Sequence, residues 1–221
     1  MSKYDKEVIE IVKNGPYVAY NIKLMIDSSG DEIDTKPKMV LCRCGHSENK
    51  PFCDGTHLQI DFNDDKKDDR VEDKVIAYKG KNITVYDNRG VCSHIGYCTS
   101  LLPQVFDKSK FKWINPDGAD IRDIIRICEL CPSGALSYSL PGGKRIQKVG
   151  NQKKQIKISP GPYGENGPFD IKGGIKLESE EEFTPECEEH YSLCRCGASK
   201  NKPFCDGNHR FHDKYEDKEN K

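Results

Sequence analysis

The stretch Cys42-Arg-Cys44-Gly-His-Ser-Glu-Asn-Lys-Pro-Phe-Cys53-Asp-Gly-Thr-His57 decides how this chain is interpreted, because it occurs twice. The second copy is Cys194-Arg-Cys196-Gly-Ala-Ser-Lys-Asn-Lys-Pro-Phe-Cys205-Asp-Gly-Asn-His209, and thirteen of the sixteen positions are identical. Each copy carries three thiols and one imidazole at the spacing C-x-C-x8-C-x3-H. Donors of these types can close a metal site. The repeat therefore predicts two metal loops of the same kind.

The duplication extends upstream of the cysteines. Asn14-Gly-Pro-Tyr17 lies 28 positions before Cys42, and Asn166-Gly-Pro-Phe169 lies 28 positions before Cys194. Alternating apolar residues with Asn-Gly and Gly-Pro turns predict short β-strands ahead of each loop. Because Asp is a good N-cap, we expect a helix to begin at Asp54 and at Asp206.

Both loops resemble the signature of the CDGSH (NEET) iron–sulfur family. The resemblance implies a [2Fe-2S] cluster in each loop, with Cys42 and Cys44 on one iron and Cys53 and His57 on the other. In the second loop it implies Cys194 with Cys196, and Cys205 with His209. It also implies that the clusters are acid-labile and can be transferred.

A structural zinc site is the alternative for these donors, because Cys3His is also a zinc ligand set. The C-x-C spacing disfavours zinc, since zinc ribbons generally place two to four residues between paired cysteines. The donor set also predicts the redox potential. With three thiolates the oxidised cluster carries a formal charge of about −1, against about −2 with four, so we expect a potential above the roughly −400 mV of plant-type ferredoxins and below Rieske values.

The segment between the copies has a different pattern. Residues 83–86 predict a strand, 101–106 a short helical turn and 135–140 a closing strand. Residues 120–128 place apolar side chains at 121, 124, 125 and 128, the pattern of an amphipathic helix.

Cysteines in this segment predict a third metal site. Cys92-Ser-His-Ile95-Gly-Tyr-Cys98 resembles the C-x2-C-x2-C run of bacterial ferredoxins with Ile95 in place of the central cysteine, and Cys131-Pro resembles their last ligand. The segment is similar to the divergent single-cluster ferredoxin family. Cys92, Cys98 and Cys131 would hold three corners of a cuboidal cluster. The fourth ligand could be Cys128 or His94; with neither, the cluster is [3Fe-4S], or [4Fe-4S] with a labile iron.

These observations predict an α+β fold made of small units. We expect two β-rich CDGSH units (residues 1–60 and 146–212) that form an intramolecular pseudo-dimer. An inserted ferredoxin-like α+β domain (74–145) follows a charged linker (61–73), and a charged tail (213–221) ends the chain. Asp64 and its charged neighbours are expected to be solvated. The protein would be a monomer with three clusters.

Composition narrows the function classes. Apolar residues make up 35% of the chain and charged residues 32%, and no apolar run approaches the roughly 20 residues of a membrane span. A formal net charge of −1 gives no sign of nucleic-acid binding. Eleven cysteines clustered with histidine favour metal sites in a reducing compartment, and we expect a cytoplasmic protein.

We expect electron transfer rather than catalysis, because the chain has no nucleophile–base pair or phosphate-binding loop. The partner would be a redox protein or an apo iron–sulfur acceptor. The alternative functions are cluster donor, redox or pH sensor, and zinc-binding adaptor. The remaining Cys187 and His190 have no metal-ligand spacing and are expected to be bystanders.

Overall fold

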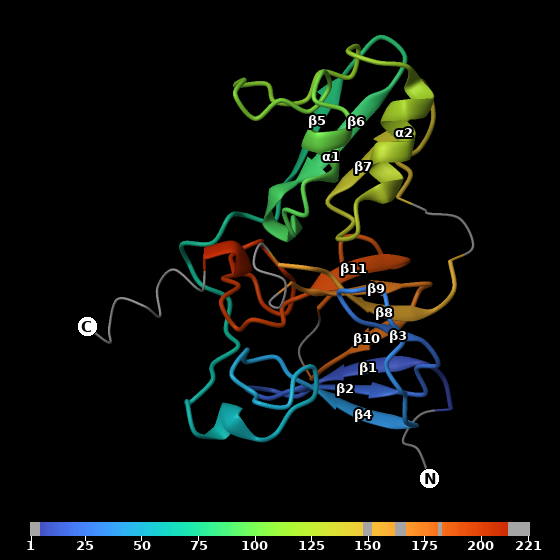
Figure 1. Ribbon diagram of the computed structural model, residues 1–221. Helices are drawn as coiled ribbons and strands as arrows, with labels where there is room; N and C mark the ends of the chain where they lie inside the picture. The colour runs from blue at the N-terminus through green and yellow to red at the C-terminus, as the bar shows by residue number, and fades with distance from the viewer. Residues whose placement is uncertain (1–4, 148–151, 162–166, 181–182, 212–221) are drawn as a thin grey trace.

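The computed structural model describes residues 5–147, 152–161, 167–180 and 183–211. Its elements are mostly strands with few helices, and the strands form three sheets (Figure 1). The first sheet has the order β10-β1-β2-β4, made by β10 (Lys176–Glu178), β1 (Val8–Ile11), β2 (Tyr17–Tyr20) and β4 (Lys38–Leu41). The second has the order β11-β9-β8-β3, made by β11 (His190–Leu193), β9 (Phe169–Lys172), β8 (Gln155–Ile158) and β3 (Met25–Ile26).

Each of these sheets takes its edge strand from the other half of the chain. β3 comes from the first half and pairs in parallel with β8, with Met25 opposite Ile156. β10 comes from the second half and pairs in parallel with β1, with Val8 opposite Lys176. The two halves are therefore joined by reciprocal strand exchange, and neither sheet is complete without the other half.

The segment between the copies forms its own sheet and helices. The antiparallel sheet β5-β6-β7 consists of β5 (Val75–Lys79), β6 (Thr84–Asn88) and β7 (Leu136–Ser139). The helical elements are η2 (Arg89–Val91), α1 (Tyr97–Leu101) and α2 (Ile121–Leu130). The predicted amphipathic helix is confirmed: Asp120 caps α2 by accepting a hydrogen bond from the Arg122 N–H at 2.9 Å. The short helical turn expected at 101–106 is confirmed just after α1 ends at Leu101: the N–H groups of Val105 and Phe106 donate to the Leu102 carbonyl at 3.1 and 3.0 Å.

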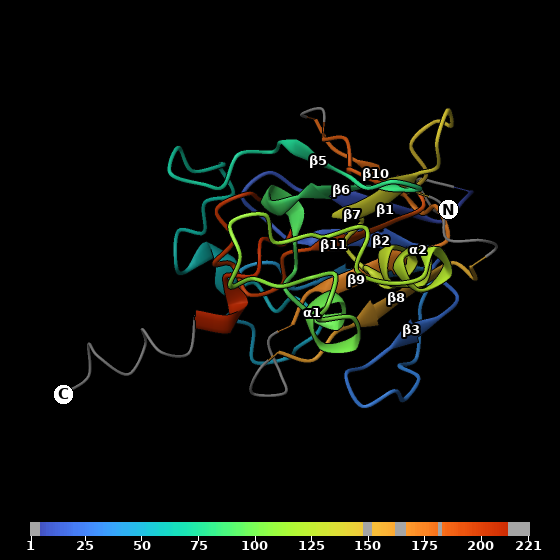
Figure 2. The same cartoon turned by 90° about the horizontal axis from the view of Figure 1, so that it is seen from above.

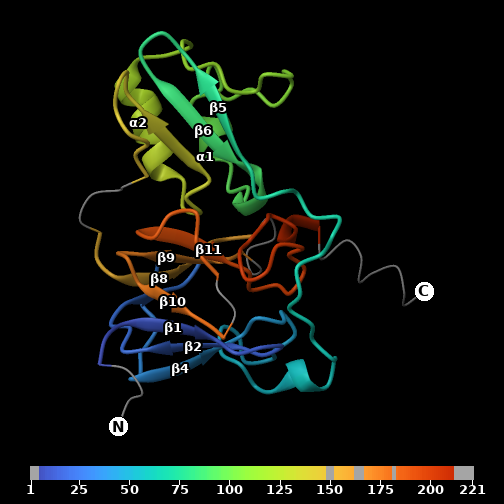
Figure 3. The same cartoon turned by 180° about the vertical axis from the view of Figure 1, so that it is seen from behind.

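The three sheets lie one after another along the molecule. The middle segment is at one end, the β11-β9-β8-β3 sheet is central, and the β10-β1-β2-β4 sheet is at the other end (Figures 1 and 3). Seen along this axis, the middle segment overlies the strands of both halves (Figure 2). The central position explains why every residue of β11 is buried.

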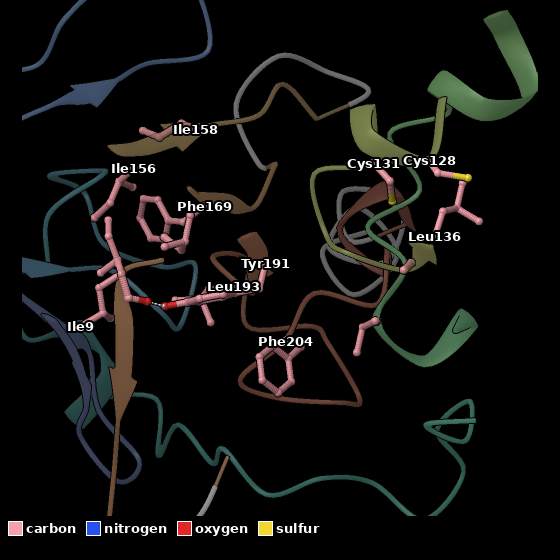
Figure 4. Close-up of a cluster of buried hydrophobic side chains, with 14 of the residues drawn as sticks. Ile9, Cys128, Cys131, Leu136, Ile156, Ile158, Phe169, Tyr191, Leu193 and Phe204 are labelled. Atoms are coloured by element: carbon pink, nitrogen blue, oxygen red, sulfur yellow. Dashed lines mark hydrogen bonds between the residues drawn. The ribbon is translucent and has the colours of Figure 1, made fainter. Parts of the chain in front are cut away.

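One hydrophobic core connects all three units. It includes Ile9 of the first half, Phe169 of the second half and Leu136 of the middle segment (Figure 4). Tyr17 and Phe169, which are equivalent positions of the duplication, meet edge to face with ring centroids 6.3 Å apart. In the described part of the chain no helix has the length and apolar character needed for a membrane span.

Candidate metal centres

The first metal loop leaves β4 and folds back onto it. Cys42 and Cys44 follow the strand directly, and their Sγ atoms lie 3.8 Å apart. Cys53 and His57 form a second pair, with Sγ and Nδ1 3.4 Å apart. Antiparallel bridging of Leu41 to Phe52 brings the two ends of the loop together. The structure therefore arranges the four predicted donors as two pairs.

The second loop repeats this geometry. It follows β11, with the Sγ atoms of Cys194 and Cys196 3.9 Å apart and Cys205 Sγ 3.5 Å from His209 Nδ1. Among the described residues no three Cys, His, Asp or Glu side chains converge on a single ion position. Two donors for each of two metal ions is the arrangement that a dimetal unit bridged by other atoms needs. A single zinc ion would need all four around one point.

In each C-x-C pair the pKa of one thiol is lowered, which favours the thiolate form that binds metal. A hydrogen bond from the neighbouring thiol lowers the pKa of Cys42 to about 6 and that of Cys194 to about 7, although burial opposes both shifts. The same hydrogen bonds and burial raise the pKa of Cys44 and of Cys196. One thiolate in each pair is thus stabilised by the proton of the other, and a metal ion would replace that proton.

The aspartate of each loop holds the backbone together rather than starting a helix. Asp54 accepts hydrogen bonds from the N–H groups of Glu48 (2.8 Å) and Thr56 (3.0 Å). Asp206 accepts equivalent bonds from Lys200 (2.8 Å) and Asn208 (3.0 Å). The helix predicted at Asp54 is wrong, since only the three-residue 3-10 turn η1 (Thr56–Leu58) follows it. At Asp206 helical residues begin only at His209 and run to the end of the described chain.

In the two Cys3His loops, backbone N–H groups donate to the second cysteine of each C-x-C pair. The N–H of His46 lies 3.5 Å from Cys44 Sγ, and that of Ala198 lies 3.4 Å from Cys196 Sγ. A position next to the C-x-C pair can supply this bond with any side chain, which fits the difference between His46 and Ala198. His46 itself is exposed.

Buried basic residues surround the loops. Arg43 pairs with Asp64 at 2.6 Å, and both are buried. The prediction that Asp64 belongs to a solvated run is therefore wrong: residues 61–73 include a buried counter-ion for the first metal loop. Lys202 is also buried and donates to the Ser199 carbonyl at 2.7 Å. Burial lowers the pKa of Lys202, although Cys194 opposes that shift.

The two loops differ in exposure. Cys53 and His57 are half-buried, and Lys50 and Asp54 beside them are exposed. In the second loop Cys205 and His209 are only 3% and 5% exposed. The middle segment accounts for part of this cover, because Asn201 of the second loop donates to the Gly90 carbonyl at 2.9 Å.

Three of the predicted ligands of the middle segment line one cavity. Cys92, Cys98 and Cys131 all contribute to its wall. The guanidinium of Arg89 donates to Cys92 Sγ at 3.6 Å, and the Ser133 hydroxyl lies 3.6 Å from Cys131 Sγ. Burial raises the pKa of Cys92 to about 12. The cavity fits a group that brings its own positive charge to three thiolates.

The two candidates for the fourth ligand, Cys128 and His94, are placed differently from the three cysteines of the cavity wall. Cys128 is not among the lining residues; it packs in the core on α2, and its sulfur points away from that of Cys131 (Figure 4). His94 does line the cavity, with φ of +58°, but both ring nitrogens face Arg89, at 3.3 and 3.5 Å. Burial lowers the pKa of His94 to about 3, and Arg89 adds to that effect.

Cys187 and His190, which have no metal-ligand spacing, lie together in the structure. Their Sγ and Nδ1 atoms are 3.3 Å apart, and both residues are buried. Burial lowers the pKa of His190 to about 4. Gly134 of the middle segment packs on Cys187, so this pair belongs to the junction between two units. The three-position spacing of Cys187 and His190 in the sequence does not predict that their side chains meet.

Two family models match this chain. The model described as iron-binding zinc finger CDGSH type matches residues 14–58 and 166–210, and the model described as divergent 4Fe-4S mono-cluster matches residues 78–141. The chain is also similar to the uncharacterized protein YjdI of Escherichia coli strain K12 and to YjdI of Escherichia coli O157:H7. Each is 38% identical over 62 residues, which is 28% of this chain and 82% of the relative. These matches agree with the two donor loops and the three-cysteine cavity, so the chain belongs to the CDGSH-type iron-binding family and carries two CDGSH units on either side of a divergent single-cluster iron–sulfur unit.

Proposed function

We propose that this protein is an electron carrier with two [2Fe-2S] clusters and one cuboidal cluster. The observation that carries the proposal is the division of each Cys3His set into two donor pairs, 3.8 and 3.4 Å in the first loop and 3.9 and 3.5 Å in the second. Iron–sulfur clusters supply reversible one-electron chemistry when bound. The residues supply ligands, burial and positive charge.

In the middle segment we propose a [4Fe-4S] cluster held by Cys92, Cys98 and Cys131, with one iron that has no cysteine ligand. The cavity wall supports three thiolate ligands, and the position of Cys128 in the core argues against a fourth. An oxidised sample that shows the EPR signal of a [3Fe-4S] cluster, and gains iron on reduction, would identify the same three-cysteine site after loss of that iron.

The reciprocal exchange of β3 and β10 supports an intramolecular pseudo-dimer of two CDGSH units. We propose that the middle segment is a ferredoxin-like insertion. We also propose that one chain works as a monomer, because the edge strands that a second chain could supply come from the other half of the same chain. Redox partner proteins, rather than small substrates, would exchange electrons with it, and we propose no enzymatic activity. All eleven cysteines are free thiols, which supports a reducing compartment such as the cytoplasm.

Anaerobic purification with iron, sulfide and zinc analysis tests the proposal. We expect a brown monomer with about eight irons and eight sulfides per chain, summed over two [2Fe-2S] and one [4Fe-4S] cluster. Redox titration by EPR should show three reversible one-electron centres. A colourless protein with one zinc ion per loop would overturn the proposal in favour of a zinc-binding adaptor.

The half-buried state of Cys53 and His57 favours a second function for the first loop, donation of its cluster to an acceptor protein. Mixing with an apo-ferredoxin at mildly acid pH distinguishes the two. Rapid transfer of the [2Fe-2S] cluster from the first loop but not from the second would support donation. Reversible redox cycling without loss of iron would support the carrier function.

A further inference from the structure

The contacts between the three metal sites are not equivalent, and they connect the sites in a defined order. The middle cavity and the second loop share a direct contact at His94 and Gly207. Gly207 lies between Cys205 and His209, and a methyl group on its Cα would overlap the ring carbon Cδ2 of His94. No spacer residue separates the His94 ring from the second metal loop.

The other edge of the same ring faces the middle site. Both nitrogens of His94 lie within 3.5 Å of Arg89, and Arg89 donates to Cys92 Sγ at 3.6 Å. His94 also lines the cavity that holds the three cysteines. A continuous line of packed groups therefore runs from Cys92 through Arg89 and His94 to the Cys205–His209 pair.

The second loop meets the first loop backbone to backbone at two glycines. A methyl group on Gly45 would overlap the carbonyl of Cys196, and one on Gly197 would overlap the carbonyl of Cys44. These reciprocal contacts join the two C-x-C turns at the centre of the strand-exchanged pair. The glycines allow an approach that no side chain would permit.

The second site is the most buried of the three. It lies between the middle segment and the first half, whereas Cys53 and His57 of the first site, and Cys92 and Cys98 of the middle site, are half-buried. Figure 1 shows the corresponding arrangement of the units, with the second half of the chain between the other two.

We propose that the second CDGSH site is an interior relay, that His94 is the residue through which it exchanges electrons with the middle site, and that the first and middle sites are the ones that meet partner proteins. This inference rests on the proposed carrier function. In each step one electron leaves one site and arrives at the next, no bond forms or breaks, and a low-potential one-electron carrier protein supplies or accepts the electron outside the chain.

The test replaces His94 by asparagine. Asparagine tolerates positive φ, so the backbone at this position is preserved while the ring that reaches Gly207 is lost. The matched control is Phe111→Asn, an exchange of a fully exposed aromatic residue of the same unit. A photochemically generated flavin semiquinone delivers less than one electron per chain, and rapid freeze-quench EPR follows the distribution of the electron between the middle cluster and the Cys3His clusters.

We expect His94→Asn to slow this equilibration several-fold, with the same final distribution, and Phe111→Asn to leave it unchanged. Iron and sulfide analysis of each variant reports the carrier function separately, because a chain without three clusters contradicts that function and not the route. His94→Gly, which also suits the positive φ, is a second variant should asparagine disturb the fold.

Equilibration at the parental rate, in either His94 variant with all three clusters present, would overturn the proposal. So would a slower rate in His190→Asn but not in His94→Asn. His190 faces the backbone of Cys131 and lies on β11, which leads to Cys194, so that result would assign the route to the strand instead.

Discussion

The hydroxyl of Tyr17, in the first half of the chain, donates to the carbonyl of Cys194 in the second metal loop at 2.9 Å and lies 3.1 Å from the carbonyl of Pro203. Its counterpart in the duplication is Phe169, which has no hydroxyl. Only the second loop is therefore tied to the opposite half in this way. Burial raises the pKa of Tyr17 well above its ordinary value, so the hydroxyl remains a donor.

Replacing Tyr17 by phenylalanine should destabilise the protein by about 1–3 kcal/mol, because the buried carbonyl of Cys194 loses its side-chain donor. The loss should also speed iron release from the second loop. The matched control is Tyr20→Phe on the same strand, whose hydroxyl donates to Glu10 rather than to a metal loop. Equal iron release from both variants, measured with a chromogenic chelator, would contradict the role of Tyr17.

The ion pair between Arg43 and Asp64 leads to a second prediction. Asp64→Asn leaves the buried guanidinium without its partner and should cost about 3–5 kcal/mol in the free energy of unfolding. The exposed neighbour Asp65 pairs with Lys13, so Asp65→Asn should have no measurable effect. Urea unfolding of the two variants side by side tests this, and similar midpoints would show that the pair is not structural.

The pair of Arg43 with Asp64 also contributes to the dependence of stability on acid pH. Burial opposes ionisation of Asp64, but the charge of Arg43 together with hydrogen bonds from Arg43, Asn14 and Lys13 outweighs it and holds the pKa of Asp64 below its usual value. A lowered pKa contributes stability at pH values above the ordinary value of about 3.9, and that stability disappears as the pH falls through the folded-state pKa. Asp64→Asn should remove this part of the acid transition.

The repeated ligand spacing predicted the two donor loops, because metal ligands appear directly in the sequence, and the family resemblance implied how the donors pair. The strands before each loop and helix α2 followed from apolar periodicity. The buried pair of Arg43 with Asp64 could not be predicted, since Asp64 lies in a run of charged residues whose solvation is the ordinary outcome. The composition of such a run does not show which of its charged residues is buried.

Differences between the two copies of the duplication also indicate which positions have a role in only one half. The difference between Tyr17 and Phe169 marks the asymmetric tie to Cys194, and the difference between His46 and Ala198 marks a position where only the backbone matters. The contact of His94 with Gly207 and the pairing of Cys187 with His190 depend on how the units pack, which local spacing does not encode.

Asp87 gives a pH prediction with the opposite sign. Burial raises the pKa of Asp87 to about 6, despite the opposing charge of Arg89. Between about pH 4 and pH 6 the folded protein holds a proton that the unfolded chain has released, so stability falls as the pH rises through this window. The loss amounts to about 3 kcal/mol by pH 7.

Asp87→Asn should therefore be more stable than the parent at pH 7 and should show a flatter pH dependence. Thermal midpoints by circular dichroism from pH 4 to pH 8 measure this. Asp107 is partly exposed, and hydrogen bonds from Ser109 lower its pKa, so Asp107→Asn should not flatten the curve. An Asp87→Asn profile parallel to the parent would contradict the prediction.

The position of Cys128 in the core predicts that it is dispensable for the middle cluster. Cys128→Ala should cost about 1 kcal/mol of stability through lost packing and leave the iron content unchanged. Cys98→Ala removes a residue of the cavity wall and should lose the middle cluster. If Cys128→Ala also lost that cluster, Cys128 would be its fourth ligand.

The exposure of the two CDGSH sites predicts that they release iron at different rates. Because Cys53 and His57 are half-buried while Cys205 and His209 are almost fully buried, a chelator at mildly acid pH should remove iron from the two CDGSH sites in two phases, the first site first. His57→Cys should slow the fast phase and lower the potential of that site, since a fourth thiolate adds negative charge. His209→Cys should lower the potential of the second site and leave the fast phase unchanged. A single phase in the parent, or a fast phase altered by His209→Cys, would show that burial of the second loop does not protect its iron.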